Sequence, residues 1–143
     1  MLAVGTDAPS FTLPDQSGTP VSLETFRGEF VVLYFYPRAD TPGCTTEACG
    51  FRDRWETYRE ADIQVIGISD DPVEDLADFA ETYDLPFTLL SDPDGAVSNA
   101  YDSYGEKQVF GNTVHGVFRN TYVVDPEGQI ALEYENVSPE GHA

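Results

Sequence analysis

Two continuous apolar runs constrain the fold of this 143-residue chain more than any other feature. Residues 30–36 read FVVLYFY between Gly28 and Pro37, and residues 63–69 read IQVIGIS. Short runs rich in β-branched and aromatic residues are typical of strands buried on both faces, as in parallel sheets. Because a parallel pair needs a crossover connection, usually a helix, the two runs predict a β-α-β unit at the centre of the fold.

The segment between these runs has the period of a helix rather than a strand. Its apolar side chains recur at positions i, i+4, i+7, i+11 and i+14. These are Cys44, Ala48, Phe51, Trp55 and Tyr58. The spacing predicts one helix over residues 42–61, with this face against the sheet.

Shorter patterns complete the architecture. We expect an N-terminal hairpin (10–13 and 19–23), a helix (72–83), a strand (87–90), a short helix (96–101) and a terminal hairpin (121–124 and 130–134). No repeat or linker divides the chain, so residues 1–143 are predicted to form a single domain. The order of elements predicts an α/β, thioredoxin-like three-layer fold, in which helices flank a mixed central β-sheet and the N-terminal β-hairpin is an extension.

Charge excludes two classes of partner. Twenty-six acidic residues against seven basic ones give a formal net charge of −19. Such a surface repels nucleic acid and anionic membranes, so we expect neither as a partner. Lys107 is the only lysine, and an acidic, lysine-poor composition is typical of proteins adapted to high salt, where charge repulsion is screened. An ordinary acidic protein is the alternative.

No leader or membrane segment is recognisable in the sequence. Residues 1–5 lack a basic region, and no apolar run approaches the roughly 20 residues of a membrane span. We therefore expect a cytoplasmic protein, in which two cysteines are more typical of catalysis or metal binding than of a structural disulfide. His115, His142 and the cysteine spacing do not fit a zinc site, so no metal is expected.

Cys44 has the position of a nucleophile. Thr41 followed by Pro42 suits a helix N-cap and first helical residue, which places Cys44 in the first turn. Unpaired N–H groups and the positive end of the helix dipole favour a thiolate there. The alternative is that Cys44 serves as a small buried apolar residue on the helix.

Cys49 follows five residues later. In an unbroken helix this spacing separates the Cα atoms by about 8.7 Å, whereas a disulfide needs them within about 7 Å. The two cysteines therefore bond only if the first turns unwind, which would couple oxidation to a local order–disorder change. Gly50 lowers helix stability at this point. The alternative is two unrelated cysteines.

The run FYPRADTPGCTTEACGFRD resembles the active-site segment of the peroxiredoxins, in particular the PrxQ or bacterioferritin comigratory protein type. The likeness includes a Pro-x-x-x-Thr-x-x-Cys core and a second cysteine five residues later. Residues 4–18 are similar to the family's N-terminal hairpin, and residues 116–125 to its arginine-bearing strand. The resemblance covers almost the whole chain.

The resemblance implies a cofactor-free thiol peroxidase that reduces hydrogen peroxide and organic hydroperoxides. Cys44 would be the peroxidatic cysteine and Cys49 the resolving cysteine. Thr41 and Arg119 would contact the nucleophile and the peroxide, and Pro37 would shield the pocket. A thioredoxin-like dithiol would return the enzyme to its reduced state, and the chain would be a monomer or weak homodimer.

Several points stay open in the sequence. The family's chain usually continues into a terminal helix beyond the point where this sequence stops, which leaves the cover of one sheet face undefined. Arg38 stands where the family often has lysine. Glu47 fits either a hydrogen bond in the active-site loop or an exposed helix position. The acids from Asp70 to Asp78 are interpreted as a solvated helix face, and residues 92–95 as a turn.

Two other functions compete with the peroxidase. A general thiol–disulfide oxidoreductase is less favoured, because that chemistry usually uses Cys-X-X-Cys and four residues separate the cysteines here. A redox-gated binding module, in which a Cys44–Cys49 disulfide reshapes a surface for a partner, is the second alternative.

Overall fold

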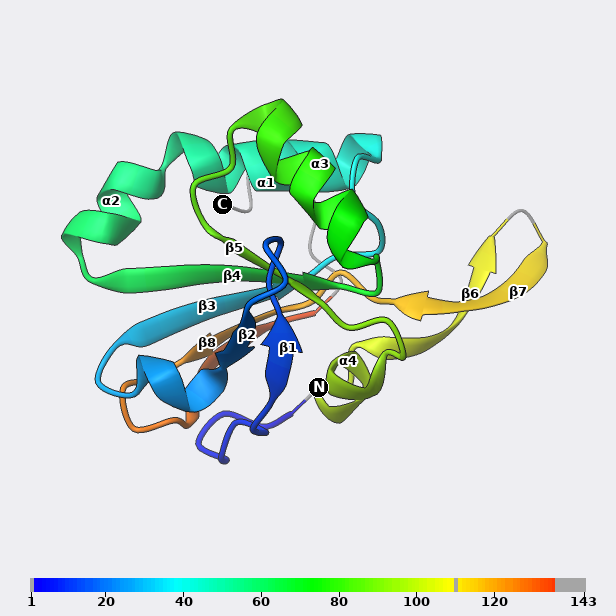
Figure 1. Cartoon of the computed structure of the whole chain (residues 1–143). Helices are drawn as coiled ribbons and strands as arrows, with labels where there is room; N and C mark the ends of the chain where they lie inside the picture. The colour runs from blue at the N-terminus through cyan, green and yellow to red at the C-terminus, as the bar shows by residue number, and fades with distance from the viewer. Residues whose placement is uncertain (1, 110, 136–143) are drawn as a thin grey trace.

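A computed structural model describes residues 2–109 and 111–135 of the chain (Figure 1). The strands are β1 (Thr12–Pro14), β2 (Pro20–Ser22), β3 (Phe30–Phe35), β4 (Ile63–Ser69), β5 (Thr88–Ser91), β6 (Tyr104–Val109), β7 (Asn112–Val117), β8 (Thr121–Val124) and β9 (Ile130–Tyr134). The helices are α1 (Pro42–Asp53), α2 (Trp55–Glu60), α3 (Val73–Tyr83) and α4 (Ala96–Ala100), with a 3₁₀ turn, η1 (Leu23–Phe26).

The central sheet has the strand order β5-β4-β3-β8-β9. The two apolar runs pair in parallel, from Phe30 opposite Ile63 to Phe35 opposite Ile68, and β5 continues the parallel part beside β4. β8 is antiparallel to β3, and β9 is antiparallel to β8. The predicted β-α-β unit and mixed sheet are confirmed.

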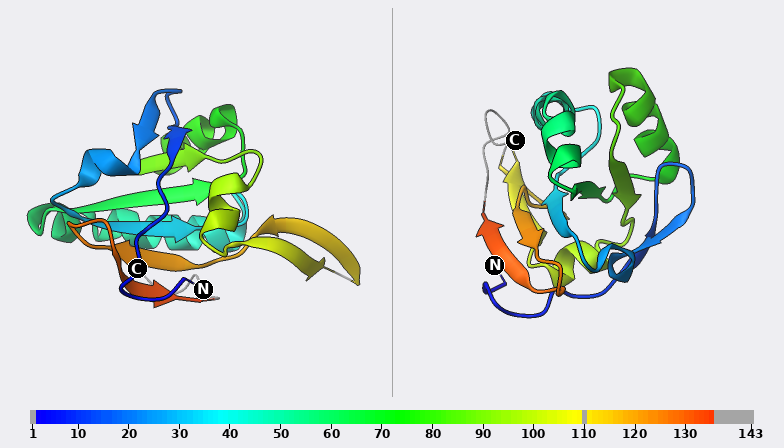
Figure 2. Two further views of the ribbon diagram at one scale, coloured as in Figure 1. Left: turned by 90° about the horizontal axis from the view of Figure 1, so that it is seen from below. Right: turned by 90° about the vertical axis from the view of Figure 1, so that its left-hand side faces the viewer.

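Alternate residues of β3 enter two separate cores, one on each face of the sheet. Leu33 packs with residues of η1, α4 and the N-terminal segment, whereas Tyr34 packs with α1 and α3. Figure 2 shows the sheet edge-on between these layers. The three-layer thioredoxin-like architecture is confirmed, and the continuous apolar character of β3 follows from its burial on both faces.

Gly67 in β4 carries the first testable prediction. A Cβ at this position would lie 2.7 Å from the Tyr34 ring, which cannot move aside because it is stacked on Tyr36 and Phe51. We expect Gly67→Ala to lower the free energy of unfolding by about 1–3 kcal/mol in chemical denaturation, as overpacking does. Gly105→Ala, whose Cβ would lie 3.1 Å from Phe118, is the matched control with a smaller loss. Equal stability of Gly67→Ala and the wild type would contradict this packing.

Two features differ from the elements that the sequence predicts. The single helix over residues 42–61 is instead α1 and α2, because Arg54 leaves helical geometry (φ −107°, ψ 9°). The resulting change of direction keeps both Phe51 and Tyr58 against the sheet, with ring centroids 5.9 Å apart.

The hairpin β6–β7, which projects from the body in Figure 1, had no predicted counterpart. Its polar side chains lack the alternation that indicates a half-buried strand.

An apolar groove of about 360 Å³ lies between the α1–α2 pair and strands β3, β8 and β9. Phe51 and Tyr58 line its helical side, and the exposed side chains of Phe30, Leu132 and Tyr134 line its sheet side.

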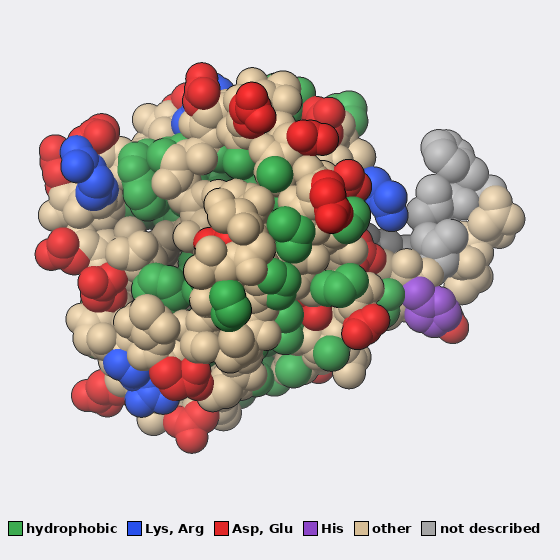
Figure 3. Space-filling view, in the orientation of Figure 1, with side chains coloured by type: hydrophobic (Ala, Val, Ile, Leu, Met, Phe, Trp, Pro, Cys, Tyr) green, Lys and Arg blue, Asp and Glu red, His purple; other side chains and the backbone are tan. Residues whose placement is uncertain are grey.

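The outer surface carries its acids in a dispersed pattern. In Figure 3 the carboxylate side chains are spread over the visible face and basic side chains are few. Within the described residues, no helix combines the length and apolar character needed to cross a bilayer. Adaptation to high salt stays a prediction from composition.

Candidate active site

Cys44 occupies the first turn of α1, as its sequence context predicts. Thr41 is the N-cap with extended backbone dihedrals, Pro42 is the first helical residue and Cys44 is the third. The Cys44 side chain is only 1% exposed and lies in the core between α1 and the sheet. The helix N-terminus therefore directs its partial positive charge toward a buried sulfur.

Arg119 brings a full positive charge to this sulfur. Its Nη2 donates to Cys44 Sγ at 3.2 Å, across 75 residues of sequence. Arg119 lies in the link between β7 and β8 rather than within a strand. The neighbouring Asn120 fixes this link, because its carbonyl accepts from the Phe35 N–H and its side-chain amide donates to Ser103 Oγ. Burial opposes the charge of the guanidinium, but Cys44 and Glu47 together raise the pKa of Arg119, which stays protonated.

Glu47 holds the other side of the same guanidinium. Its Oε1 accepts from Arg119 Nη1 at 2.7 Å, and its side chain is fully buried. Its Oε2 has no hydrogen-bond partner among the described residues. Burial raises the pKa of Glu47 from 4.5 to about 7, although the charge and hydrogen bond of Arg119 act in the opposite direction. The structure thus decides between the two readings of Glu47: it is a buried partner of Arg119, one helical turn from Cys44.

The raised pKa of Glu47 predicts a pH dependence of stability. Between pH 4.5 and about 7 the folded protein keeps a proton on Glu47 that the unfolded chain has released. The stability contribution present below pH 4.5 is therefore lost as the pH rises to 7, by roughly 3 kcal/mol at most. We expect the free energy of unfolding of Glu47→Gln, compared with the wild type at constant ionic strength, to lack this decline. Parallel pH profiles of the two proteins would contradict the assignment.

Thr41 and Pro37 lie in the segment between β3 and α1. The Thr41 hydroxyl donates to the Arg38 carbonyl at 2.8 Å instead of capping the helix, so its lone pairs are available to accept a hydrogen bond. Pro37 is half-buried and lies two residues after the end of β3. Arg38 is exposed and lines a pocket of about 210 Å³ whose other charged residues include Asp40 and Asp75.

Asp71 corrects one interpretation of the sequence. Among the acids from Asp70 to Asp78, Glu74, Asp75 and Asp78 are exposed as expected, but Asp71 is only 4% exposed. Its Oδ2 accepts from the Ala39 N–H at 2.6 Å and from Ser69 Oγ at 2.8 Å. This carboxylate is buried because it satisfies the backbone of the active-site loop at the end of β4.

Cys49 lies on the same unbroken helix as Cys44. It is partly buried, and both cysteines are free thiols. The structure therefore has the helical geometry in which the two sulfurs cannot bond.

The burial of two residues of this site, Glu47 and Asp71, was not predicted from the sequence. Glu47 stands with Cys44, Ala48 and Phe51 at helical spacing on the buried face of α1, and that register could have indicated its burial. Asp71 had no such signal, because its partner Ala39 lies 32 residues away. The turn predicted at residues 92–95 is present, with Asp92 accepting from the Ser98 N–H and hydroxyl. Within the described ranges, no cluster of three or more potential metal ligands occurs.

Comparisons with known proteins place the chain in a family. Residues 4–133 match the AhpC/TSA family. A putative peroxiredoxin of Mycobacterium tuberculosis is 51% identical over 99% of this chain and 90% of its own length. Peroxiredoxin Bcp of Escherichia coli K12 is 43% identical with the same coverage.

Solved structures of peroxiredoxins resemble this chain in both fold and sequence. Peroxiredoxin Q of Xanthomonas campestris superposes with a TM-score of 0.91 at 32% identity, over 99% of this chain and 92% of that one. PrxQ of Xylella fastidiosa superposes with a TM-score of 0.93 at 27% identity, over 99% and 91%. With a buried cysteine at a helix N-terminus under an arginine, and with these relatives along nearly its whole length, the chain belongs to the AhpC/TSA family as a peroxiredoxin of the Bcp/PrxQ type.

Proposed function

We propose that this peroxiredoxin reduces hydrogen peroxide and organic hydroperoxides through Cys44, with Cys49 as the resolving cysteine and a thioredoxin-like dithiol as the reductant. The observation that carries the proposal is the 3.2 Å contact between Arg119 Nη2 and Cys44 Sγ at the N-terminus of α1. A buried sulfur between a helix N-terminus and a guanidinium is stabilised as the thiolate, which is the nucleophile.

In the first step, the Cys44 thiolate attacks the terminal oxygen of the hydroperoxide. The S–O bond forms as the O–O bond breaks, giving a sulfenic acid and an alkoxide or hydroxide that takes up a proton. Negative charge moves from sulfur to the leaving oxygen, so a donor fixed beside both atoms stabilises the transition state. Arg119 is suited to this role, because Glu47 and the Asn120 anchor hold its guanidinium in place.

Thr41 and Pro37 complete the proposed peroxide site. With its proton committed to the Arg38 carbonyl, the Thr41 hydroxyl is left as an acceptor for the O–H group of a peroxide. Pro37 has no N–H group and lies two residues beyond β3, where it would limit access of water to the thiolate.

In the second step, the Cys49 thiol attacks the sulfenic acid, forming the disulfide and releasing water. The first turns of α1 unwind for this reaction. A dithiol then exchanges with the disulfide, so that two thiols are oxidised in the reductant and two are restored in the enzyme. Such a cycle suits the reducing cytoplasm. The protein would act as one domain, residues 1–143, and as a monomer or weak homodimer.

Rapid mixing of the reduced protein with hydrogen peroxide tests the proposal, with loss of the Cys44 thiol followed by mass spectrometry after an acid quench. We expect oxidation of Cys44 well above the rate of a free thiolate, followed by an intramolecular disulfide. A rate no faster than that of a free thiolate would refute the peroxidase function.

A further inference from the structure

Tyr83, the last residue of α3, contacts the cysteine-bearing segment on both sides. Its hydroxyl donates to Asp40 Oδ1 at 2.8 Å, directly before the N-cap of α1. Its backbone carbonyl accepts from Arg52 Nη1 at 2.8 Å, three residues beyond Cys49. One residue of a neighbouring helix therefore joins the two ends of the stretch that contains both cysteines.

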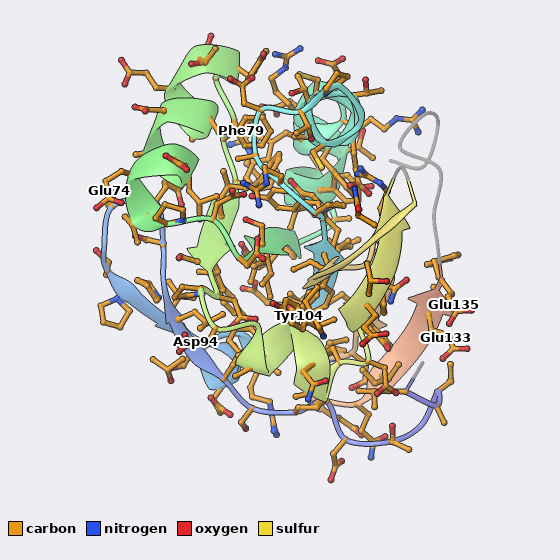
Figure 4. The ribbon with its side chains drawn as sticks, turned by 90° about the vertical axis from the view of Figure 1, so that its right-hand side faces the viewer. Glu74, Phe79, Asp94, Tyr104, Glu133 and Glu135 are labelled. Atoms are coloured by element: carbon orange, nitrogen blue, oxygen red, sulfur yellow. The ribbon has the colours of Figure 1, made fainter. Side chains whose placement is uncertain are left out.

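α3 holds Tyr83 in a fixed position. Its inner face is anchored by the buried side chains of Leu76 and Phe79, and the ring of Phe79 meets that of Tyr83 edge-on at 5.6 Å. Figure 4 shows Phe79 on the side of α3 that faces α1. The Arg52 guanidinium bonds a carbonyl at the C-terminus of α3, where a cation is favourable. The Tyr83 hydroxyl is thus presented from a rigid element.

Asp40, the partner of Tyr83 in this contact, lies in the loop before α1. It has a left-handed backbone (φ +58°), which aspartate adopts more readily than most residues and which turns the chain into the N-cap Thr41. The hydrogen bond to Asp40 is the largest influence that raises the pKa of Tyr83, so the hydroxyl remains a donor at neutral pH. The contact therefore fixes the start of α1 from outside the helix.

We propose that the Tyr83 hydroxyl is a latch that holds the first turns of α1 in helical form and thereby sets the lifetime of the Cys44 sulfenic acid. Tyr83 is a positioning residue in this role, acting through Asp40. The inference rests on the proposed function, since disulfide formation requires these turns to unwind. Breaking the Tyr83–Asp40 bond removes one interaction that is present in the helical state and lost in the unwound state.

The latch acts on a choice between two reactions of the sulfenic acid. Attack by the Cys49 thiol gives the disulfide and water. Oxidation by a second hydroperoxide gives the sulfinic acid and an alcohol, or water when the oxidant is hydrogen peroxide. A longer-lived helix slows the first reaction and leaves the second unchanged, so the latch raises the proportion of sulfinic acid at high peroxide.

Tyr83→Phe tests this latch, because it removes the hydroxyl and keeps the ring against Phe79. We expect the disulfide to form about threefold faster or more, the size of one exposed hydrogen bond. The rate constant for Cys44 with peroxide should be unchanged, and the yield of sulfinic acid per turnover should fall by the same factor. Tyr104→Phe, the same change on the α4 side of the sheet, is the matched control (Figure 4). Asp40→Asn keeps an oxygen acceptor for the Tyr83 hydroxyl and should resemble the wild type.

Hydrogen exchange separates failure of the latch from failure of the proposed function. Without any peroxide, the amides of residues 45–48 in reduced Tyr83→Phe should exchange about threefold faster than in the wild type or Tyr104→Phe. Unchanged exchange, or a disulfide rate that does not rise, would overturn the latch. A fall in the peroxide rate constant together with the disulfide rate would make Tyr83 a structural residue. Slow peroxide reaction of the wild type, with faster exchange in Tyr83→Phe, would refute the peroxidase and not the helix contact.

Discussion

Arg119→Ala should lower the second-order rate constant for oxidation of Cys44 by hydrogen peroxide by about 100- to 1000-fold, the usual effect of removing one preorganised donor from a developing oxyanion. The guanidinium contacts Cys44 Sγ at 3.2 Å. Its loss removes the positive charge that stabilises both the thiolate and the departing oxygen. Rapid mixing with quenched mass spectrometry measures the rate constant. Arg119→Lys should recover only part of the loss, because an ammonium cannot reach Cys44 and Glu47 with the same planar fork.

The control for Arg119 separates chemistry from stability. Arg119→Ala leaves the buried Glu47 without its partner, so some loss of unfolding free energy is expected. The double variant Arg119→Ala/Glu47→Gln carries no buried carboxyl group at this position and should recover stability without recovering the rate. Recovery of both would show that Arg119 acts by maintaining the fold.

Cys49→Ser should leave the first oxidation of Cys44 within about twofold of the wild type and almost abolish turnover with a thioredoxin-like reductant. A thiol on the same segment acts at an effective concentration in the millimolar range, whereas a reductant present at about 10 μM must attack the sulfenic acid directly, roughly 100-fold more slowly. Because serine has nearly the shape of cysteine, α1 keeps its structure in the reduced variant and the site of the first step is preserved.

Two measurements follow the Cys49→Ser variant. Mass spectrometry after one equivalent of peroxide should show sulfenic acid that persists, and excess peroxide should convert it to sulfinic acid. Ala48→Ser, at the adjacent helix position, changes a buried side chain and keeps both thiols, so it serves as the comparison for structural damage. Turnover of Cys49→Ser at the wild-type rate would show that Cys49 is not the resolving cysteine.

Helices and strands with a clear apolar pattern could be predicted from the sequence. The runs 30–36 and 63–69 became β3 and β4 because burial on both faces leaves a continuous apolar pattern. The break at Arg54 was missed because the apolar period continues through it, from Phe51 to Tyr58. The hairpin β6–β7 was missed because its sequence, YGEKQV and NTVHGV, lacks the apolar alternation of a half-buried strand.

By itself the sequence determined the local geometry of the thiols. Thr41 and Pro42 place Cys44 in a first helical turn, and five residues of helix keep Cys49 out of bonding range, since both follow from caps and pitch. Only the tertiary structure decided that Arg119 reaches Cys44, that Glu47 is buried beneath that arginine and that Tyr83 holds the loop before α1. These contacts join residues 43 to 75 positions apart, and their formation depends on how the sheet and α3 pack, for which no local period in the sequence exists.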